Sequence, residues 1–153
     1  MFTVRNVLYP TDFSSYSNQA YFHALAQAEI HGASLTILYV LNPNQRTPGR
    51  SRDEDRNYWR GMLEQIRPAN SDIPVTHVLL EGDPAQEIIT FARDAEIDLI
   101  VLGTHGRTGK ERLLMGSVAE KVLRDGPCSV LVVKLPKGNP NGARPDVELT
   151  VSK

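Results

Sequence analysis

The fold is decided by residues 98–118, which read DLIVLGTHGRTGKERLLMGSV. Four consecutive apolar residues, Leu99 to Leu102, predict a short buried strand. A glycine-rich stretch from Gly103 to Gly116 follows, and Ser117 opens a segment with helical periodicity. Its expected inner positions are Val118, Val122 and Leu123. A buried strand, a glycine-rich loop and a helix in succession are typical of a parallel α/β sheet.

The same alternation runs along most of the chain. Apolar runs at 7–9, 35–40, 75–80 and 129–133 predict four further strands. Between them, the sequence predicts one helix ending near Gly32, a second over 53–66 with Tyr58, Met62 and Ile66 on one face, and a third opened by Asp83 and Pro84. Because the strands are continuously apolar, we expect a parallel sheet with helices on both faces, a three-layer α/β/α domain. A ligand should lie at the carboxyl ends of its strands.

Two segments fall outside this pattern. Residues 44–52 are polar and basic and contain Pro48 and Gly49, which predicts a mobile loop. Residues 136–153 contain three prolines and two glycines, so we expect a folded domain over 1–135 and a flexible C-terminal tail over 136–153.

Composition narrows the range of functions. Of the 153 residues, 41% are hydrophobic and 23% are charged, which is ordinary for a globular domain. The net charge of −1 gives no field that favours nucleic acid or an anionic membrane. The single cysteine, Cys128, excludes an intrachain disulfide and is expected to be an inert thiol. The first apolar run stops at Pro10, too short for a signal peptide or a membrane span, so we expect a cytoplasmic protein.

Known phosphate-binding motifs do not fit the glycine-rich stretch. A Walker A loop places four residues between its glycines and a Ser or Thr after its lysine, whereas five residues separate Gly103 from Gly109 and Glu111 follows Lys110. A dinucleotide fingerprint needs glycines after the first strand, where residues 10–14 have none. The signatures of nucleotidyl transferases and PP-loop ATPases are also missing there. Slow ATP hydrolysis near Asp12, His105 or Ser117 stays open.

The stretch nevertheless has the chemistry of an anion site. Gly106 and Gly109 can adopt positive φ and expose backbone N–H groups. Gly116 and Ser117 stand at a helix N-terminus, which attracts phosphate. Three cations lie between these two ends, namely Arg107, Lys110 and Arg112. In the alternative interpretation these glycines are only turn residues, Ser117 caps its helix with Glu120 as partner, and Asp12 caps the first helix.

The spacing Gly103-x2-Gly106-x9-Gly116-Ser117 resembles the nucleotide-binding pattern of the ATP-binding branch of the universal stress protein family. The resemblance covers about residues 3–134. Segments that resemble the family's strands and turns are residues 7–14, 35–40, 82–85, 98–103 and 127–133.

This resemblance implies a five-stranded sheet of order 3-2-1-4-5 with an adenine nucleotide α-hydrolase-like fold. It implies a stress-response protein that binds an adenine nucleotide, foremost ATP, with Mg²⁺ or Mn²⁺ held through the phosphates, and acts as a dimeric switch. A dimeric interaction protein that binds no nucleotide, or a slow ATPase, are the alternatives. The homodimer would form through the fifth strand, Ser129, Val130, Leu131, Val132 and Val133.

The resemblance also gives roles to individual residues. Asp12 and Val40 would meet the adenine or the nearby sugar, and Gly103 would lie along the ribose. Gly106, Gly116 and Ser117 would hold the phosphates, and Val118 would offer another backbone N–H. The whole candidate site consists of Pro10, Thr11, Asp12, Val40, Leu102, Gly103, Gly106, Arg107, Gly109, Gly116, Ser117 and Val118.

Overall fold

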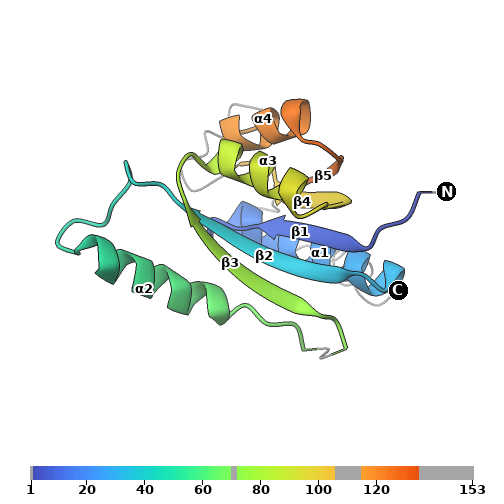
Figure 1. Cartoon of the computed structure of the whole chain (residues 1–153), viewed down its shortest axis with the longest axis horizontal. Coiled ribbons are helices and arrows are strands. Elements are labelled where there is room, and N and C mark those ends of the chain that lie inside the picture. Colours follow the sequence, from blue (N-terminus) through green and yellow to red (C-terminus); the bar gives the residue numbers. More distant parts are fainter. Residues whose placement is uncertain (1, 70–71, 106–114, 135–153) are drawn as a thin grey trace, which may run out of the picture.

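The computed structural model describes residues 2–69, 72–105 and 115–134. Strands and helices alternate along this part of the chain (Figure 1). In chain order they are β1 Asn6–Pro10, α1 Ser15–His31, β2 Ser34–Leu41, α2 Arg52–Glu64, β3 Val75–Glu81, α3 Pro84–Asp94, β4 Leu99–Gly103, α4 Ser117–Asp125 and β5 Ser129–Val133.

The strands form one parallel sheet in the order β3-β2-β1-β4-β5, which confirms the predicted topology. Strand β1 lies in the centre, where Leu8 is aligned with Thr36 on one side and with Ile100 on the other. The chain moves outward from β1 in one direction through β2 and β3, and in the other direction through β4 and β5. The carboxyl ends of β1 and β4 are therefore the switch point at which such sheets bind ligands.

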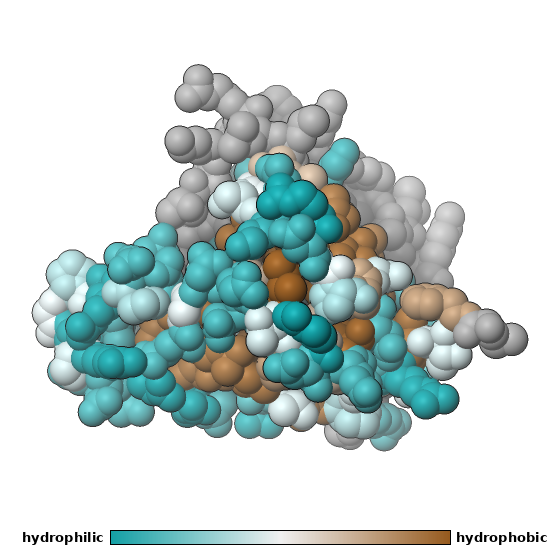
Figure 2. Space-filling model, turned by 45° about the horizontal axis from the view of Figure 1, so that its top comes forward, coloured by the Kyte–Doolittle hydropathy of each residue, from teal (hydrophilic) through white to brown (hydrophobic). Residues whose placement is uncertain are grey.

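Helices cover both faces of the sheet, as Figure 1 shows. On one face α1 and α2 pack on side chains such as Val7, Ile37 and Val101, and on the other α3 and α4 pack on Leu8, Leu38 and Ile100. Adjacent strand residues alternate between these two cores, because successive side chains of a strand point to opposite faces. Figure 2 shows hydrophobic residues still visible between hydrophilic ones on the molecular surface. None of the helices among the described residues has the length and apolarity that a membrane span requires.

The first and third helices show which capping expectations hold. Asp83 caps α3 as predicted, with its carboxylate accepting the backbone N–H of Gln86. The alternative interpretation in which Asp12 caps α1 is wrong, because Ser14 is the N-cap and accepts the N–H of Ser17. Asp12 instead accepts the N–H of Ser14, in a turn that precedes the helix.

The inner faces of α2 and α4 also differ from expectation. Of the three predicted inner residues of α2, Ile66 packs against the core, but Tyr58 is exposed. Leu63 is buried and Trp59 packs against the core instead of Tyr58. On α4, Leu123 is exposed and Ala119 takes the buried position beside Val122. Periodicity alone gave the larger side chain the inner place, whereas packing close to α3 favours a small one.

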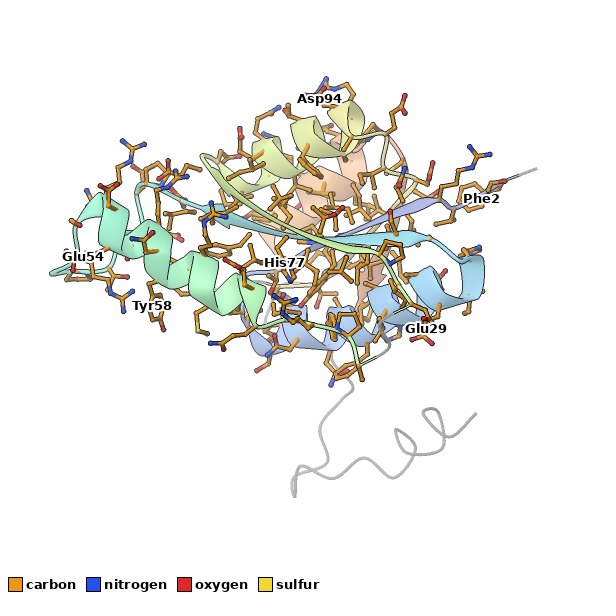
Figure 3. All side chains as sticks on the ribbon, turned by 60° about the horizontal axis from the view of Figure 1, so that its bottom comes forward. Phe2, Glu29, Glu54, Tyr58, His77 and Asp94 are labelled. Atoms are coloured by element: carbon orange, nitrogen blue, oxygen red, sulfur yellow. The ribbon has the colours of Figure 1, made fainter. Side chains whose placement is uncertain are left out.

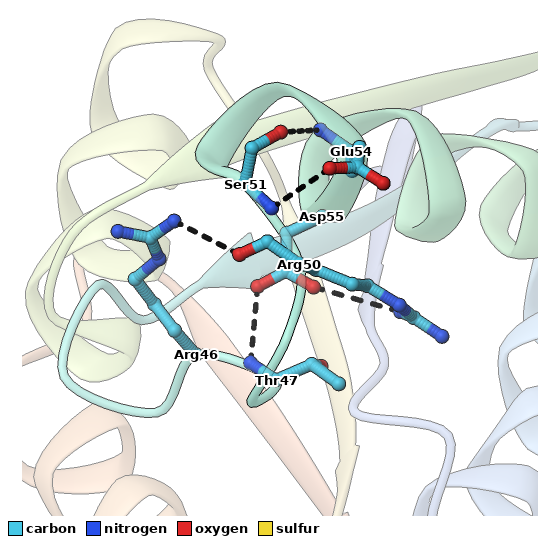
Figure 4. A network of polar contacts seen from close by, with 6 residues as sticks. All are labelled: Arg46, Thr47, Arg50, Ser51, Glu54 and Asp55. Atoms are coloured by element: carbon cyan, nitrogen blue, oxygen red, sulfur yellow. Dashed lines mark hydrogen bonds and ion pairs between the residues drawn. The ribbon is translucent and has the colours of Figure 1, made fainter.

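The loop before α2 is held by the helix that follows it. The buried carboxylate of Asp55 accepts the N–H of Thr47 at 3.1 Å and lies 3.5 Å from the guanidinium of Arg50 (Figure 4). Ser51 and Glu54 form a reciprocal capping box at the same place (Figure 4). The predicted mobile loop is thus tied to the core, because a buried carboxylate needs a hydrogen-bond donor and a counter-charge, and Thr47 and Arg50 supply them.

Candidate functional site

A cavity of about 480 Å³ opens at the carboxyl edge of the sheet. It extends from the ends of β2 and β3, across the end of β1, to the end of β4 and the first turn of α4. It therefore lies at the switch point of the sheet.

The structure brings together at this cavity all the predicted site residues that it describes. They come from three strand ends and from the start of α4, so only the folded chain makes them neighbours. They are Pro10, Thr11, Asp12, Val40, Leu102, Gly103, Gly116, Ser117 and Val118. The other three, Gly106, Arg107 and Gly109, lie outside the described residues.

The turn from β1 into α1 is fixed by hydroxyl groups. The Ser17 hydroxyl donates to the Thr11 hydroxyl at 2.7 Å and accepts the N–H of Asp12 at 3.3 Å. The Tyr9 hydroxyl donates to the Ser17 carbonyl at 2.7 Å. Burial raises the pKa of Tyr9, partly offset by its hydrogen bonds to Ser17 and Thr11, so Tyr9 stays neutral. This network holds Thr11 and Asp12 in place on the cavity wall.

The first turn of α4 presents backbone donors to the cavity. Gly116 is the N-cap, and its own N–H donates to the carbonyl of Thr104, closing the base of the glycine-rich stretch. The N–H groups of Ser117, Val118 and Ala119 come before the first hydrogen bond within the helix, and no described residue accepts from them. The predicted Ser117 capping box is wrong, because Ser117 is the first helical residue and its hydroxyl makes no cap. That hydroxyl is available to a ligand.

Gly103 has a structural reason to be glycine. It is the last residue of β4, and a Cβ there would stand 2.6 Å from the backbone carbonyl oxygen of Tyr16 in α1. The resemblance implied only that Gly103 would lie along a ribose. The structure shows that a side chain here would collide with the helix behind the strand.

Several cavity residues were missed by the sequence analysis. Asn42, Gln45 and Asp83 follow the ends of β2 and β3. His105, which the sequence had indicated only as a residue near possible slow ATP hydrolysis, follows the end of β4 and also lines the cavity. The rule that ligands lie beyond the carboxyl ends of strands would have selected Asn42 and Asp83. The remaining missed residues are Ser17, Leu38, Tyr39, Pro84, Ile88 and Ala119.

Cys128 does not line the cavity. It is partly buried at the start of β5, and burial, with a smaller contribution from the Asp98 carboxylate, raises the pKa of its thiol. The thiol is therefore mostly protonated at neutral pH, as expected of an unreactive cysteine.

The two ends of the cavity differ chemically. At the α4 end are free backbone N–H groups, the Ser117 hydroxyl and the imidazole of His105, which packs on Tyr16 with ring centroids 5.0 Å apart. At the β2–β3 end are side-chain amides and the carboxylate of Asp83. A ligand with an anionic part and a hydrogen-bond-donating part therefore fits in one orientation, with the anionic part at the α4 end and the donating part at the β2–β3 end.

Sheet order, helix cover and an edge cavity of this kind define a ligand-binding domain of the doubly wound α/β class. Within this class, the model of the universal stress protein family matches residues 3–134. The chain belongs to the universal stress protein family.

Individual members of this family are similar to the chain over most of its length. Universal stress protein MJ0531 of Methanocaldococcus jannaschii is 36% identical over 142 residues, which cover 87% of this chain and 84% of that protein. The solved structure of MJ0577 from the same organism matches with a TM-score of 0.78 at 29% identity, covering 89% of this chain and 99% of that one. A universal stress protein crystallised in complex with cAMP matches with a TM-score of 0.66 at 25% identity, covering 86% of this chain and 97% of that one.

Proposed function

We propose that this protein binds an adenine nucleotide, foremost ATP, in the cavity at the carboxyl edge of its sheet. We propose further that it acts in the cytoplasm as a homodimeric regulator of a stress response, in which the bound nucleotide is a switch rather than a substrate.

The observation that carries the proposal is the convergence of nine predicted residues on one cavity. Its volume of about 480 Å³ lies within the range of small-molecule and cofactor sites. Val40 and Leu102 supply apolar walls for a base, and the free N–H groups of Ser117 and Val118 supply donors for phosphate oxygens. Asp12 lies between these two ends at the end of β1, within reach of a ribose.

The comparisons support the choice of ligand at a coarser level. One family member of similar fold was crystallised with cAMP, an adenine nucleotide. The pattern of glycines that resembles the ATP-binding branch includes Gly103 and Gly116, and both line the cavity. In our proposal Mg²⁺ or Mn²⁺ enters with the nucleotide, bound to its phosphates.

The dimer proposal is supported by the edge of the sheet. Among the described residues, β5 has β4 as its one strand neighbour. Val130, Leu131 and Val132 are only partly buried. An apolar edge strand is a ready site for pairing with another chain, and a second copy of β5 would cover it.

Equilibrium dialysis with ATP tests the site. We expect saturable binding at or below millimolar ATP by the unmodified protein, and a loss of at least tenfold in affinity in Gly116→Val, which places a branched side chain at the α4 N-terminus. Gly61→Ala, in the exposed middle of α2, is the matched glycine control and should bind like the unmodified protein. Absence of binding at millimolar ATP, or unchanged binding by Gly116→Val, would contradict the site.

A further inference from the structure

The β2–β3 end of the cavity is a compact polar corner. Leu41 and Glu81 are aligned as the last residues of their strands, and the N–H of Gly82 donates to the carbonyl of Leu41 at 3.1 Å. Asn42 and Asp83 therefore leave the sheet side by side, and both line the cavity.

Asp83 is an exposed residue that is anchored in this corner as a helix cap. Its Oδ2 accepts the N–H of Gln86 at 2.9 Å as the N-cap of α3, and Pro84 follows at the first helical position. Gly82 before it has a φ of +146°, and a Cβ there would lie 2.9 Å from Glu87. With one carboxylate oxygen engaged by the helix, the other remains as an acceptor at the cavity rim.

Asp83 differs in kind from the amides beside it. The amides of Asn42 and Gln45 each offer both a donor and an acceptor, so they can adapt to either type of partner. An ionised carboxylate only accepts. It forms a charge-assisted hydrogen bond with an amino group, and it repels a carbonyl oxygen placed at the same point.

We infer that Asp83 is a specificity-determining residue, which accepts a hydrogen bond from the exocyclic amine of the purine and so selects adenine over 6-oxo purines. Adenine carries an amino donor at C6, where guanine and hypoxanthine carry an oxygen acceptor. Phosphates bound at the α4 N-terminus direct the base toward the β2–β3 end, because these are the two ends of one cavity. The inference rests on the proposed nucleotide function.

The test compares ATP with inosine triphosphate, which carries an oxygen in place of the amine at C6. In calorimetric titrations we expect the unmodified protein to prefer ATP by about tenfold, the value of one hydrogen bond to a charged group. In Asp83→Asn we expect this preference to fall to about twofold or less, because the amide can donate to the oxygen. Asn caps helices as well as Asp does, so the stability of the variant should match that of the unmodified protein.

Asp94→Asn is the matched control. Asp94 is the last residue of α3 (Figure 3), at the opposite end from Asp83, and it does not line the cavity. Its variant should retain the full preference. Equal affinity of the unmodified protein for ATP and inosine triphosphate would overturn the inference while leaving the proposed function intact. An equal loss of affinity for both ligands in Asp83→Asn would also overturn the inference. If this variant had in addition lost the ability to discriminate against 2′-deoxy-ATP, Asp83 would be assigned to the ribose. If the unmodified protein bound neither ligand, the proposed function and the inference would both fail.

Discussion

At the scale of the single residue, Gly103 links the cavity to the packing behind it. A Cβ at this position would stand 2.6 Å from the carbonyl oxygen of Tyr16, which belongs to backbone and cannot move aside. We expect Gly103→Ala to lower the free energy of unfolding by about 1–3 kcal/mol, the usual effect of overpacking. Urea denaturation followed by circular dichroism measures it.

The control for this variant is another glycine. Gly61 lies within α2 with open space where a Cβ would stand, so Gly61→Ala should raise stability by about 0.5–1 kcal/mol. If Gly103→Ala kept full stability and lost only nucleotide affinity, ligand contact rather than helix packing would explain this glycine.

A variant of Ser117 tests whether its hydroxyl caps the helix or binds a ligand. Because Gly116 is the cap and the Ser117 hydroxyl is not engaged by the helix, Ser117→Ala should change the free energy of unfolding by no more than about 0.5 kcal/mol. Under the proposed function its affinity for ATP should fall about fivefold, the value of one hydrogen bond. Thermal unfolding and equilibrium dialysis give the two readouts.

A variant of Ser51 should show the opposite pair of effects, a loss of stability without a loss of ATP affinity. It is the N-cap of α2 with a complete capping box, and it does not line the cavity. Ser51→Ala should lower stability by about 1 kcal/mol and leave ATP affinity unchanged. If Ser117→Ala lost stability by the same amount, the Ser117 hydroxyl would cap α4 after all, as the sequence predicted.

At the scale of the element, the loop before α2 depends on an ionised Asp55. Burial by itself raises the pKa of this carboxyl, but the hydrogen bond from the N–H of Thr47 and the nearby guanidinium of Arg50 outweigh burial and bring the pKa below its ordinary value. The pKa of Glu81 is also lowered, first by its hydrogen bond from Arg52. Because both pKa values are lower in the folded protein, their stabilising contribution is complete above the ordinary carboxyl pKa of about 4 and is lost as the pH falls through the folded values.

We therefore expect the free energy of unfolding to decline below about pH 4, and Asp55→Asn to weaken that decline. The variant should also be less stable at pH 7, because an amide places its N–H₂ group against the Arg50 guanidinium. Urea denaturation between pH 3 and pH 7 tests this. Asp53→Asn, an exposed change in the same helical turn, should keep the acid decline, and an equal decline in Asp55→Asn would contradict the role of Asp55.

The helices and strands also show how much of the fold can be predicted from local sequence. The strands were predictable, because runs such as 35–40 are apolar on both faces and only a covered parallel sheet accommodates them. The start of α3 was also predictable, from Asp83 and Pro84. The start of α1 was not, because Asp12, Ser14 and Ser15 are all plausible caps within four residues. Ser14 accepts the N–H of Ser17, whose hydroxyl donates to the Thr11 hydroxyl. These hydrogen bonds exist only once the turn has formed, so the sequence does not show which residue is the cap.

The site was predictable to the same extent. Residues at glycine-marked strand ends, such as Gly103 and Gly116, stand out in the sequence, and the structure places both at the cavity. Gln45 could not be found from its neighbours, because its position depends on a loop that is held by the distant carboxylate of Asp55. Asp83 was identified only as a helix cap, and its second place at the cavity rim depends on the alignment of β2 with β3.

At the scale of the whole molecule, the geometry of β5 makes the proposed dimer testable. The carbonyl of Val133 accepts the N–H of Thr104 at 3.1 Å, so it points toward the β4 side. Within a strand the N–H and C=O of one residue point the same way and those of its neighbours point the opposite way. The backbone groups of Val130 and Val132 therefore point away from β4, toward the edge where no other described strand pairs, and those of Leu131 point to β4.

Val132→Pro removes an outward N–H that a partner strand would use, and proline is tolerated on an edge strand at such a position. If the proposed dimer forms through β5, we expect this variant to be a folded monomer by size-exclusion chromatography with light scattering, with a far-ultraviolet circular dichroism spectrum close to that of the unmodified protein. Leu131→Pro removes instead a donor that faces β4, and should lower the stability of the fold itself by about 3 kcal/mol. A Val132→Pro protein that remained dimeric would show that the two copies meet elsewhere, and the nucleotide proposal would stand independently of that result.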